Sequence, residues 1–295
     1  MEDLVKAGKI ASEARKYGLS LIKVGASLLE VTEKIEEKIV SLGGKPAFPT
    51  QFSVNNITAH YNSLVGDKYI FGKDLVKFDL GVHINGKIAD CAISVDLSGK
   101  NSKLILASSE ALKVAINLAK PGVMLYEIGA AIENTIKEFG FAPVKNLSGH
   151  GLGDYDVHSA PTIPNYDNGD KTKLKKGQVI AIEPFASTGE GLVMNGKKSE
   201  IYSLKNLKNV RNKHAREILK FINEEYRTLP FSKRAILKKF SKLQTAIGIS
   251  NLLRENVLHE YSVLVERDSN ALVAQTEHTL IVGEKVTTLW FYYPI

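Results

Sequence analysis

The chain repeats part of its own sequence at a spacing of 97 residues. Residues 12–46 align without gaps to residues 109–143, and 14 of the 35 aligned positions are identical. Unrelated sequences of ordinary composition would share roughly two. A solenoid needs at least three repeats. We therefore expect two similar halves related by pseudo-twofold symmetry, with the active site where the halves meet.

Each copy of the repeat is expected to form two helices followed by strands. Strand-like segments follow the helical pairs, at residues 76–84, 87–95 and 179–182. Gly43 and Pro46 end the second helix of the first copy. The apolar residues of that helix recur every three or four positions, which is the spacing of one helical face. They are Leu28, Val31, Ile35, Ile39 and Leu42.

A predicted hairpin over residues 76–95 places two acids close together. Its central Asn-Gly pair predicts a two-residue type I′ turn. That register puts Asp90 opposite Gly81 and Asp79 opposite Ala92. The two acids are then diagonal neighbours about 7–8 Å apart on one face, and Gly81 leaves room between them. In a buried sheet these carboxylates repel each other unless a cation lies between them; on a solvated hairpin they would need none.

Three more residues are candidates for the same metal site. His150 lies between glycines that let the backbone pass close to a cluster. Glu183 ends the apolar segment 179–182, and Glu277 lies within residues 272–282, which we expect to form one strand. A buried carboxylate must be paired or bound to a metal. Four carboxylates and one imidazole suit Mn, Fe, Co or Zn, and a pair of such ions can activate water at neutral pH.

Two further histidines are candidates for positions beside this site. The repeat brings His60 to within one residue of the position of His158, so they would flank the site from opposite halves. A structural role in a turn or cap is the alternative for each. Cys91 and His278 are expected to point away from the acidic face and to serve packing.

The composition excludes several classes of protein. Hydrophobic residues make up 44% and charged residues 24% of the 295 residues, as in soluble globular proteins. One cysteine permits no internal disulfide and favours the reducing cytoplasm. No apolar run reaches the ~18 residues of a membrane span. The sequence has no P-loop, no dinucleotide-binding glycine motif, no nucleophile elbow and no Cys-x-x-Cys pair.

Basic residues gather in one segment of the chain. Residues 205–242 contain 12 Lys or Arg and three Glu, which gives +9, whereas the whole chain carries +7. Helical periodicity returns over residues 203–258, and we expect this region to be a subdomain inserted between two strands of one sheet. Such a basic run is usually a solvated helix face, but its confinement to one segment makes contact with RNA a second hypothesis.

The motifs around the five ligands resemble those of the pita-bread metallopeptidases, and in particular of type II methionine aminopeptidases. The resemblance covers essentially the whole chain and is to the short archaeal form. The ligand motifs are Phe78-Asp79-Leu80-Gly81 with Asp90, Gly149-His150-Gly151, Ile182-Glu183-Pro184 and Gln275-Thr276-Glu277-His278. The type II segments are Ala47-Phe48-Pro49-Thr50, Asn55-Asn56-Ile57 with His60-Tyr61, and Thr228-Leu229-Pro230-Phe231.

This resemblance implies an α+β pita-bread fold with a curved antiparallel sheet between the duplicated halves. It implies a catalytic domain formed by residues 1–202 and 259–295, and a winged-helix-like insertion at 203–258. It also implies a cytoplasmic monomer that removes the initiator methionine from nascent proteins when the second residue is small. The basic residues 205–242 would allow contact with the ribosome.

The resemblance further implies two divalent metal ions per chain and a hydroxide that bridges them and attacks the scissile carbonyl. Asp79 would chelate one ion, Asp90 and Glu277 would bridge both, and His150 and Glu183 would hold the other. The remaining roles fall on five residues. Glu183 would be the general base, His158 would stabilise the oxyanion, His60 would contact the substrate amide, and Phe48 and Ile201 would line the methionine pocket.

Two alternatives stay open at this stage. One is a proline-directed aminopeptidase or prolidase of the same fold, which shares the five ligands but usually carries a separate N-terminal domain. The other is a non-catalytic relative that binds RNA or the ribosome, although such proteins lose ligands and all five are present here. The metal used in the cell is not determined by these ligand types.

Overall fold

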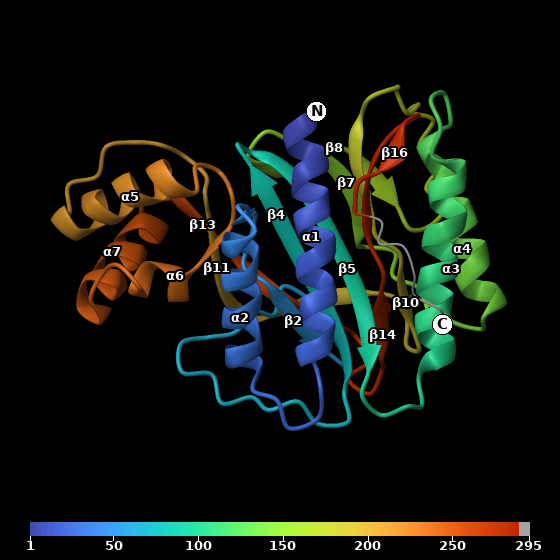
Figure 1. Cartoon of the computed structure of the whole chain (residues 1–295), viewed down its shortest axis with the longest axis horizontal. Coiled ribbons are helices and arrows are strands. Elements are labelled where there is room, and N and C mark those ends of the chain that lie inside the picture. The colour runs from blue at the N-terminus through green and yellow to red at the C-terminus, as the bar shows by residue number, and fades with distance from the viewer. Residues whose placement is uncertain (289–295) are drawn as a thin grey trace.

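The computed structural model describes residues 1–288, and its elements form two similar halves with a helical lobe at one side (Figure 1). The first half is built from two helices and five strands. They are α1 (Glu2–Leu21), α2 (Leu28–Ser41), β1 (Lys45–Pro46), β2 (Gln51–Val54), β3 (Ile57–Ala59), β4 (Leu75–Ile84) and β5 (Lys87–Asp96).

The second half repeats this order and ends near the C-terminus. It contains α3 (Ser102–Leu118), α4 (Leu125–Glu138), β6 (Ala142–Pro143), β7 (Ser148–Gly153), β8 (Asp156–Pro164), β9 (Val179–Ile182), β10 (Phe185–Ser187), β14 (Val273–Gln275), β15 (His278–Ile281) and β16 (Lys285–Val286). Every strand pair among residues 1–288 for which a register is defined is antiparallel.

The sequence repeat is a repeat of structure. Shifting the bounds of α2 by 97 residues gives those of α4, and the same shift converts β1 into β6. The glycines that end the two helices share a left-handed backbone, with φ of 85° at Gly43 and 83° at Gly140. A side chain with a Cβ rarely adopts this conformation, so the same residue type ends both helices.

The hairpin of β4 and β5 has the predicted register. Gly81 pairs with Asp90 and Asp79 pairs with Ala92. Asn85 and Gly86 both have positive φ, 50° and 86°, as a type I′ turn requires. Fourteen of the 20 residues of these strands are buried and none is exposed, which rules out the alternative of a solvated hairpin.

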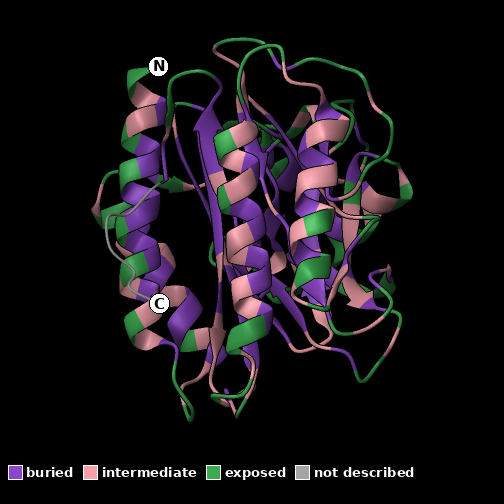
Figure 2. Cartoon of the chain, turned by 90° about the vertical axis from the view of Figure 1, so that its right-hand side faces the viewer, coloured by how far each residue is buried: buried purple, intermediate pink, exposed green. Residues whose placement is uncertain are grey.

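The four long helices cover the outer side of the sheets. Apolar faces of α1 and α2 pack on β2, β4 and β5, and those of α3 and α4 pack on the strands of the second half. Figure 2 shows this arrangement as buried residues on the sheet side of the helices and exposed residues on the outer side. The opposite side of the sheets is therefore free to form a site. No helix within residues 1–288 is both long enough and apolar enough to cross a bilayer.

The helical lobe is formed by the segment between β11 (Val193–Leu204) and β13 (Leu258–Glu266), which pair with each other. Because β11 and β13 pair, the segment leaves and rejoins the same sheet. Strand β13 also pairs with β3 of the first half. The lobe has its own apolar core. Its elements are α5 (Lys213–Glu225), β12 (Phe231–Ser232), α6 (Lys233–Leu237) and α7 (Lys242–Arg254).

The prediction of one continuous strand over residues 272–282 is wrong. The segment consists of β14 and β15, separated by Thr276 and Glu277. The cause is a change of partner, because β14 pairs with β10 whereas β15 pairs with β9. Glu277 therefore lies at a break between two strands. Its backbone still exchanges two hydrogen bonds with Ala92 of β5.

Candidate metal centre

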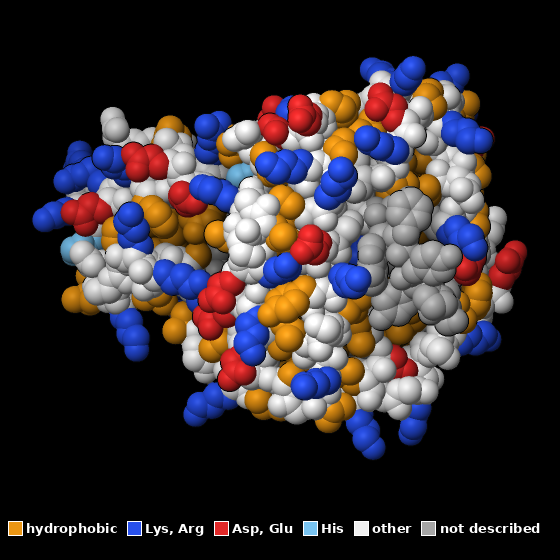
Figure 3. All heavy atoms as spheres, in the orientation of Figure 1, with side chains coloured by type: hydrophobic (Ala, Val, Ile, Leu, Met, Phe, Trp, Pro, Cys, Tyr) orange, Lys and Arg blue, Asp and Glu red, His pale blue; other side chains and the backbone are white. Residues whose placement is uncertain are grey.

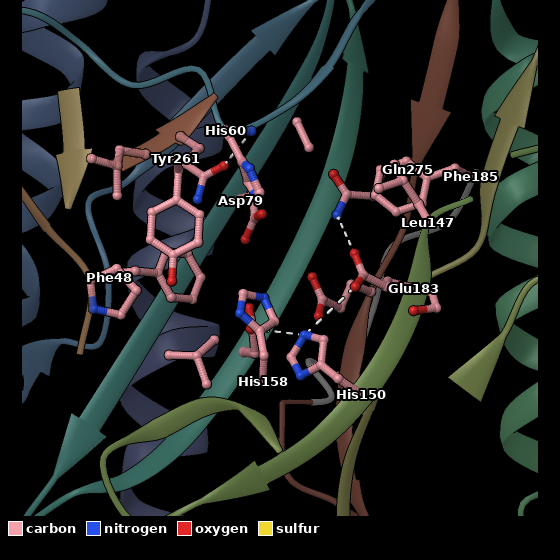
Figure 4. A pocket seen from close by; sticks show the side chains of 18 of the residues that line it. Phe48, His60, Asp79, Leu147, His150, His158, Glu183, Phe185, Tyr261 and Gln275 are labelled. Atoms are coloured by element: carbon pink, nitrogen blue, oxygen red, sulfur yellow. Dashed lines mark hydrogen bonds and ion pairs between the residues drawn. The ribbon is translucent and has the colours of Figure 1, made fainter. Parts of the chain in front are cut away.

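The predicted site residues line one cavity of about 230 Å³ between the two halves (Figure 4). Strands β4 and β5 of the first half contribute two acids, and the second half contributes the other ligands around β7, β9 and the break before β15. The predicted residues on the cavity wall are Phe48, His60, Asp79, Asp90, His150, His158, Glu183, Ile201 and Glu277. Residues up to 229 positions apart in the sequence thus meet in one place.

The acids and one imidazole are close enough to share cations. Ligand atoms of Asp90, His150 and Glu277 all lie within 4.8 Å of one another. The Nε2 atom of His150 lies 3.6 Å from Oε1 of Glu183 and 3.9 Å from Oδ2 of Asp90. Figure 4 shows His150 and Glu183 turned toward each other across the cavity.

Three buried carboxylate oxygens in the cavity have no hydrogen-bond partner among the described residues. They are Oδ1 of Asp79, Oδ1 of Asp90 and Oε1 of Glu277. Asp90 and Glu277 are 3% and 1% exposed. Buried polar atoms in folded proteins are nearly always hydrogen-bonded, and these three oxygens are instead placed to bind a cation. The oxygen and imidazole donors fit a divalent transition metal.

Burial raises the pKa of all four carboxylates in the cavity, and repulsion by neighbouring carboxylates adds to the rise in three of them. Burial raises the pKa of Asp79 to about 7. The pKa values of Asp90, Glu183 and Glu277 lie well above the usual range, first because of burial and then because neighbouring carboxylates repel the second charge. Such a cluster is costly as a set of anions, and it becomes favourable when divalent charge offsets it.

The imidazole of His150 is arranged as a neutral ligand. Burial, followed by the charge of His158, lowers the pKa of His150 to about 3. Its Nδ1 atom lies 3.2 Å from the carbonyl oxygen of Gly151. A carbonyl can only accept, so Nδ1 carries the hydrogen and the lone pair of Nε2 faces the acids.

The glycines around His150 serve a different purpose from the one expected. A Cβ at Gly149 would overlap the carbonyl oxygen of Ala181, and one at Gly151 would overlap that of Ala160. These carbonyls belong to the strands on either side of β7. The glycines therefore let three strands pack closely, and they fix His150 indirectly.

His60 and His158 flank the cavity from opposite halves, as their positions in the repeat predict. Burial is the main cause that lowers the pKa of His60 to about 4, and burial also lowers the pKa of His158. Both rings are therefore neutral near pH 7. The Nδ1 atom of His60 lies 3.3 Å from the carbonyl oxygen of Ser262, which leaves Nε2 as an acceptor. The rings of His158 and His150 are 4.7 Å apart.

Phe48 and Ile201 form part of the apolar wall of the cavity. The ring of Phe48 occupies the room beside Gly81, because a Cβ there would overlap three of its ring carbons. Gly81 was expected to leave space between two carboxylates. In the structure it makes space for the aromatic ring.

Gln275 and Tyr261 also line the cavity, and neither was predicted from the sequence to have a role in the site. Gln275 Nε2 donates to Oε2 of Glu183 at 3.2 Å. The spacing of two residues between Gln275 and Glu277 was a signal that both face the same side. Tyr261 packs edge-on against His60, with the ring centres 5.6 Å apart. Its place depends on the pairing of β13 with β3, for which the sequence offers no local signal.

Cys91 and His278 lie outside the ligand cluster, as predicted. The Sγ atom of Cys91 lies 3.8 Å from the carbonyl oxygen of Leu80 and is fully buried. His278 Nδ1 lies 2.9 Å from the hydroxyl of Thr288. Cys91 therefore contributes to packing, and His278 contributes a hydrogen bond outside the site.

The family of the chain follows from its sequence. The family model of metallopeptidase family M24 matches residues 2–224. The chain belongs to metallopeptidase family M24. The resemblance seen in its motifs is thereby confirmed. The methionine aminopeptidase of Archaeoglobus fulgidus is 47% identical to it over 291 residues, which cover 97% of this chain and 98% of that protein.

Solved structures share the fold of this M24 member. The crystal structure of methionine aminopeptidase from Thermotoga maritima has a TM-score of 0.70 at 23% identity and covers 97% of this chain and 95% of its own. A thermophilic Arx1 has a TM-score of 0.82 at 17% identity, with coverages of 94% and 87%. Both confirm a mixed α+β fold with a curled antiparallel sheet.

Proposed function

We propose that this M24 peptidase is a methionine aminopeptidase that removes the N-terminal methionine from proteins. Its full-length relative of that name and its membership of a metallopeptidase family support this function. The observation that carries it is the group of buried carboxylate oxygens without partners, on Asp79, Asp90 and Glu277, around a neutral His150.

The five ligands would hold two divalent cations of Co, Mn, Fe(II) or Zn. Asp79 would bind the first, His150 and Glu183 the second, and Asp90 and Glu277 would lie between them. When bound, such ions polarise a carbonyl and lower the pKa of water. The fit rests on the three partnerless oxygens and on the free Nε2 of His150.

Glu183 is placed to move the proton during hydrolysis. Its Oε2 is fixed by Gln275, and its Oε1 faces the cavity 3.6 Å from His150. Burial and the charge of Asp79 raise its pKa. A carboxylate fixed beside the reacting water can accept its proton. Glu183 would take a proton from water and return it to the leaving amine.

His60 and His158 would hold the substrate peptide group from its two sides. As a neutral ring, His158 can donate one N–H to the oxygen that gains charge at the scissile carbonyl. His60, whose Nδ1 faces the carbonyl of Ser262, would accept the amide N–H through Nε2. Phe48 and Ile201 would contact the methionine side chain. The small volume favours a small second residue.

Peptide hydrolysis tests the function directly. We expect apo protein to cleave Met-Ala-Ser only after addition of Mn²⁺, Fe²⁺, Co²⁺ or Zn²⁺, and to leave Ala-Pro and Gly-Pro intact. Absence of Met-Ala-Ser cleavage with all four ions would refute the proposal. Cleavage of the proline dipeptides alone would favour the proline-directed alternative.

The variant Asp90→Asn tests the shared ligand. Removing one negative charge from the cluster should reduce Met-Ala-Ser turnover at least 100-fold, because even partners of ligands contribute 10–100-fold. The fold should persist, since the apo cluster contains less repulsion. Circular dichroism and thermal unfolding provide the control. Turnover near that of the unmodified protein would contradict the role of Asp90.

We further propose that residues 1–202 and 259–295 form the catalytic domain and that 203–258 form a winged-helix-like insertion that contacts ribosomal RNA. Ten of the 12 basic side chains in residues 205–242 are exposed, whereas Lys233 is half-buried and Arg234 is buried. Lys and Arg side chains project from this lobe in Figure 3. Nascent chains on ribosomes are made in the cytoplasm, which is where we expect the enzyme.

Charge reversal tests the ribosome contact. The variant Arg211→Glu/Lys213→Glu/Lys220→Glu should co-sediment less with ribosomes. The ribosome binding that remains should depend less on salt concentration. A matched control reverses three exposed lysines outside the lobe, Lys171, Lys173 and Lys175. Equal co-sedimentation of both variants would remove the proposal without affecting the peptidase function.

A further inference from the structure

The two halves of the fold meet along a seam between β5 and residues 273–281. At its centre, Ala92 and Glu277 exchange two backbone hydrogen bonds. Ala92 N donates to Glu277 O at 3.4 Å, and Glu277 N donates to Ala92 O at 2.9 Å. Two residues that exchange both bonds in this way resemble a hydrogen-bonded pair of antiparallel strands.

On either side of that pair, a hydroxyl group takes the place of a backbone partner. Thr279 Oγ1 accepts from Asp90 N at 2.8 Å and donates to Asp90 O at 2.9 Å. Ser94 Oγ accepts from Gln275 N at 2.8 Å and donates to Gln275 O at 2.8 Å. Each hydroxyl thus satisfies both polar groups of one residue opposite, and both side chains are buried.

The two hydroxyl bridges are related by the local twofold symmetry of the two antiparallel segments. Ser94 lies two residues after Ala92, and Thr279 lies two residues after Glu277. A twofold axis through the central pair of antiparallel strands exchanges these positions. It also exchanges Asp90 with Gln275. Each half therefore contributes one such hydroxyl bridge, Ser94 from the first and Thr279 from the second.

The bridged residues are those that carry the site. Asp90 is held by Thr279, and Gln275, whose side chain binds Glu183, is held by Ser94. Thr279 also pairs with Ala181 of β9, and Ala181 pairs with His150 of β7. A row of neighbouring residues thus connects Asp90 to His150 through Thr279 and Ala181.

We infer that Thr279 and Ser94 are positioning residues that set the separation of the two halves and thereby the spacing of Asp90, Glu277 and His150 for metal binding. This inference rests on the proposed function. A hydroxyl inserted between two backbones keeps them farther apart than a direct N–H···O=C bond of about 2.9 Å would. Removing it leaves a buried N–H and C=O without partners, so the strands must shift.

Metal binding by apo protein tests the inference independently of turnover. We expect Thr279→Val, which keeps the shape and removes the hydroxyl, to weaken Mn²⁺ binding 10–100-fold in calorimetry, as loss of an outer partner does. The absorption spectrum of bound Co²⁺ should change. Thr279→Ser restores the hydroxyl and should restore both readouts.

Thr32→Val is the matched control. Thr32 is fully buried and its hydroxyl donates to a backbone carbonyl, that of Leu28, but it lies within α2. It should bind Mn²⁺ as the unmodified protein does. Unchanged affinity and an unchanged Co²⁺ spectrum in Thr279→Val would overturn the inference.

Ser94→Ala decides the question if Thr279→Val does not fold. It should weaken Mn²⁺ binding in the same direction through Gln275, and affinity equal to that of the unmodified protein would overturn the inference. Failure of the unmodified protein to bind metal would instead count against the proposed function. The two failures are therefore distinguishable.

Discussion

Individual acids in the cavity lower the stability of the metal-free protein, and the same acids provide ligands for a metal ion. Asp79, Asp90 and Glu277 each keep a buried oxygen without a partner among the described residues. An unsatisfied buried group costs about 1–3 kcal/mol, and more when charged. A divalent cation offsets this cost, so the same atoms that destabilise the apo protein are those that bind the ion.

Gly81 is the residue on which the shape of the methionine pocket depends. In Gly81→Ala, the new Cβ overlaps the ring of Phe48, and the ring must move into the cavity. We expect a loss of about 1–3 kcal/mol in stability and a raised KM for Met-Ala-Ser. Gly72→Ala is the control, because its Cβ would meet only ordinary contact distances. An unchanged KM would show that Phe48 does not contact the substrate.

His83 should make stability depend on pH. Burial, and then the charge of Lys45, lowers the pKa of His83 to about 4 from 6.5, while Glu225 acts in the opposite direction. Between these values the unfolded chain binds more protons, so the free energy of unfolding falls as pH falls. The loss between pH 7 and pH 5 should be about 2 kcal/mol.

The variant His83→Gln isolates this contribution. Gln keeps an acceptor for the backbone N–H of Gly86, which now donates to His83 Nδ1, but it does not titrate. Urea unfolding at several pH values should show a smaller loss in the variant than in the unmodified protein. Equal pH dependence of the two proteins would rule out a contribution from His83.

At the scale of elements, an ion pair fastens the helical lobe to the first half. Arg234 of α6 donates two hydrogen bonds to Glu36 of α2, at 2.7 and 2.9 Å. The side chains are only 7% and 16% exposed. On the other side, the guanidinium of Arg227 lies 4.2 Å from the ring centre of Tyr155 in the second half. The lobe therefore contacts both halves.

Removing one partner of that ion pair should lower the stability more than replacing both partners with apolar residues. Glu36→Leu leaves the buried Arg234 with only the more distant Glu33, at 3.9 Å, and should lose about 3 kcal/mol of stability. The double variant Glu36→Leu/Arg234→Met removes both charges and should recover much of the loss. Urea unfolding of both single variants and the double variant gives the coupling energy. Additive losses would show that the pair is not coupled.

At the scale of the whole molecule, metal binding should stabilise the fold, because ligands from both halves converge on one cavity. Free ion at 100 times its Kd adds about 2.7 kcal/mol to the free energy of unfolding. Treatment with a chelator should lower Tm, and Mn²⁺ should restore it. Asp90→Asn should show a smaller restoration. Identical Tm values with and without metal would contradict a site that joins the halves.

Much of the architecture could be read from local patterns. The 97-residue repeat predicted the shared bounds of α2 and α4, and the Asn-Gly turn predicted the register of Asp79 and Asp90. The bounds of each helix depend on the periodicity within one copy of the repeat, and the register depends on the turn residues between the two strands. Both are interactions between residues close in sequence. The break at Glu277 was missed, because it arises from two different partner strands.

The sequence by itself determined which residue types could bind metal and in what order they occur. Only the tertiary structure decided how they meet: Gly81 accommodates Phe48, Tyr261 reaches His60, and Thr279 and Ser94 join the two halves. The physical reason is distance along the chain. A pairing such as that of Asp90 with Thr279 spans 189 residues, and no local preference of the backbone encodes the strand that will lie opposite.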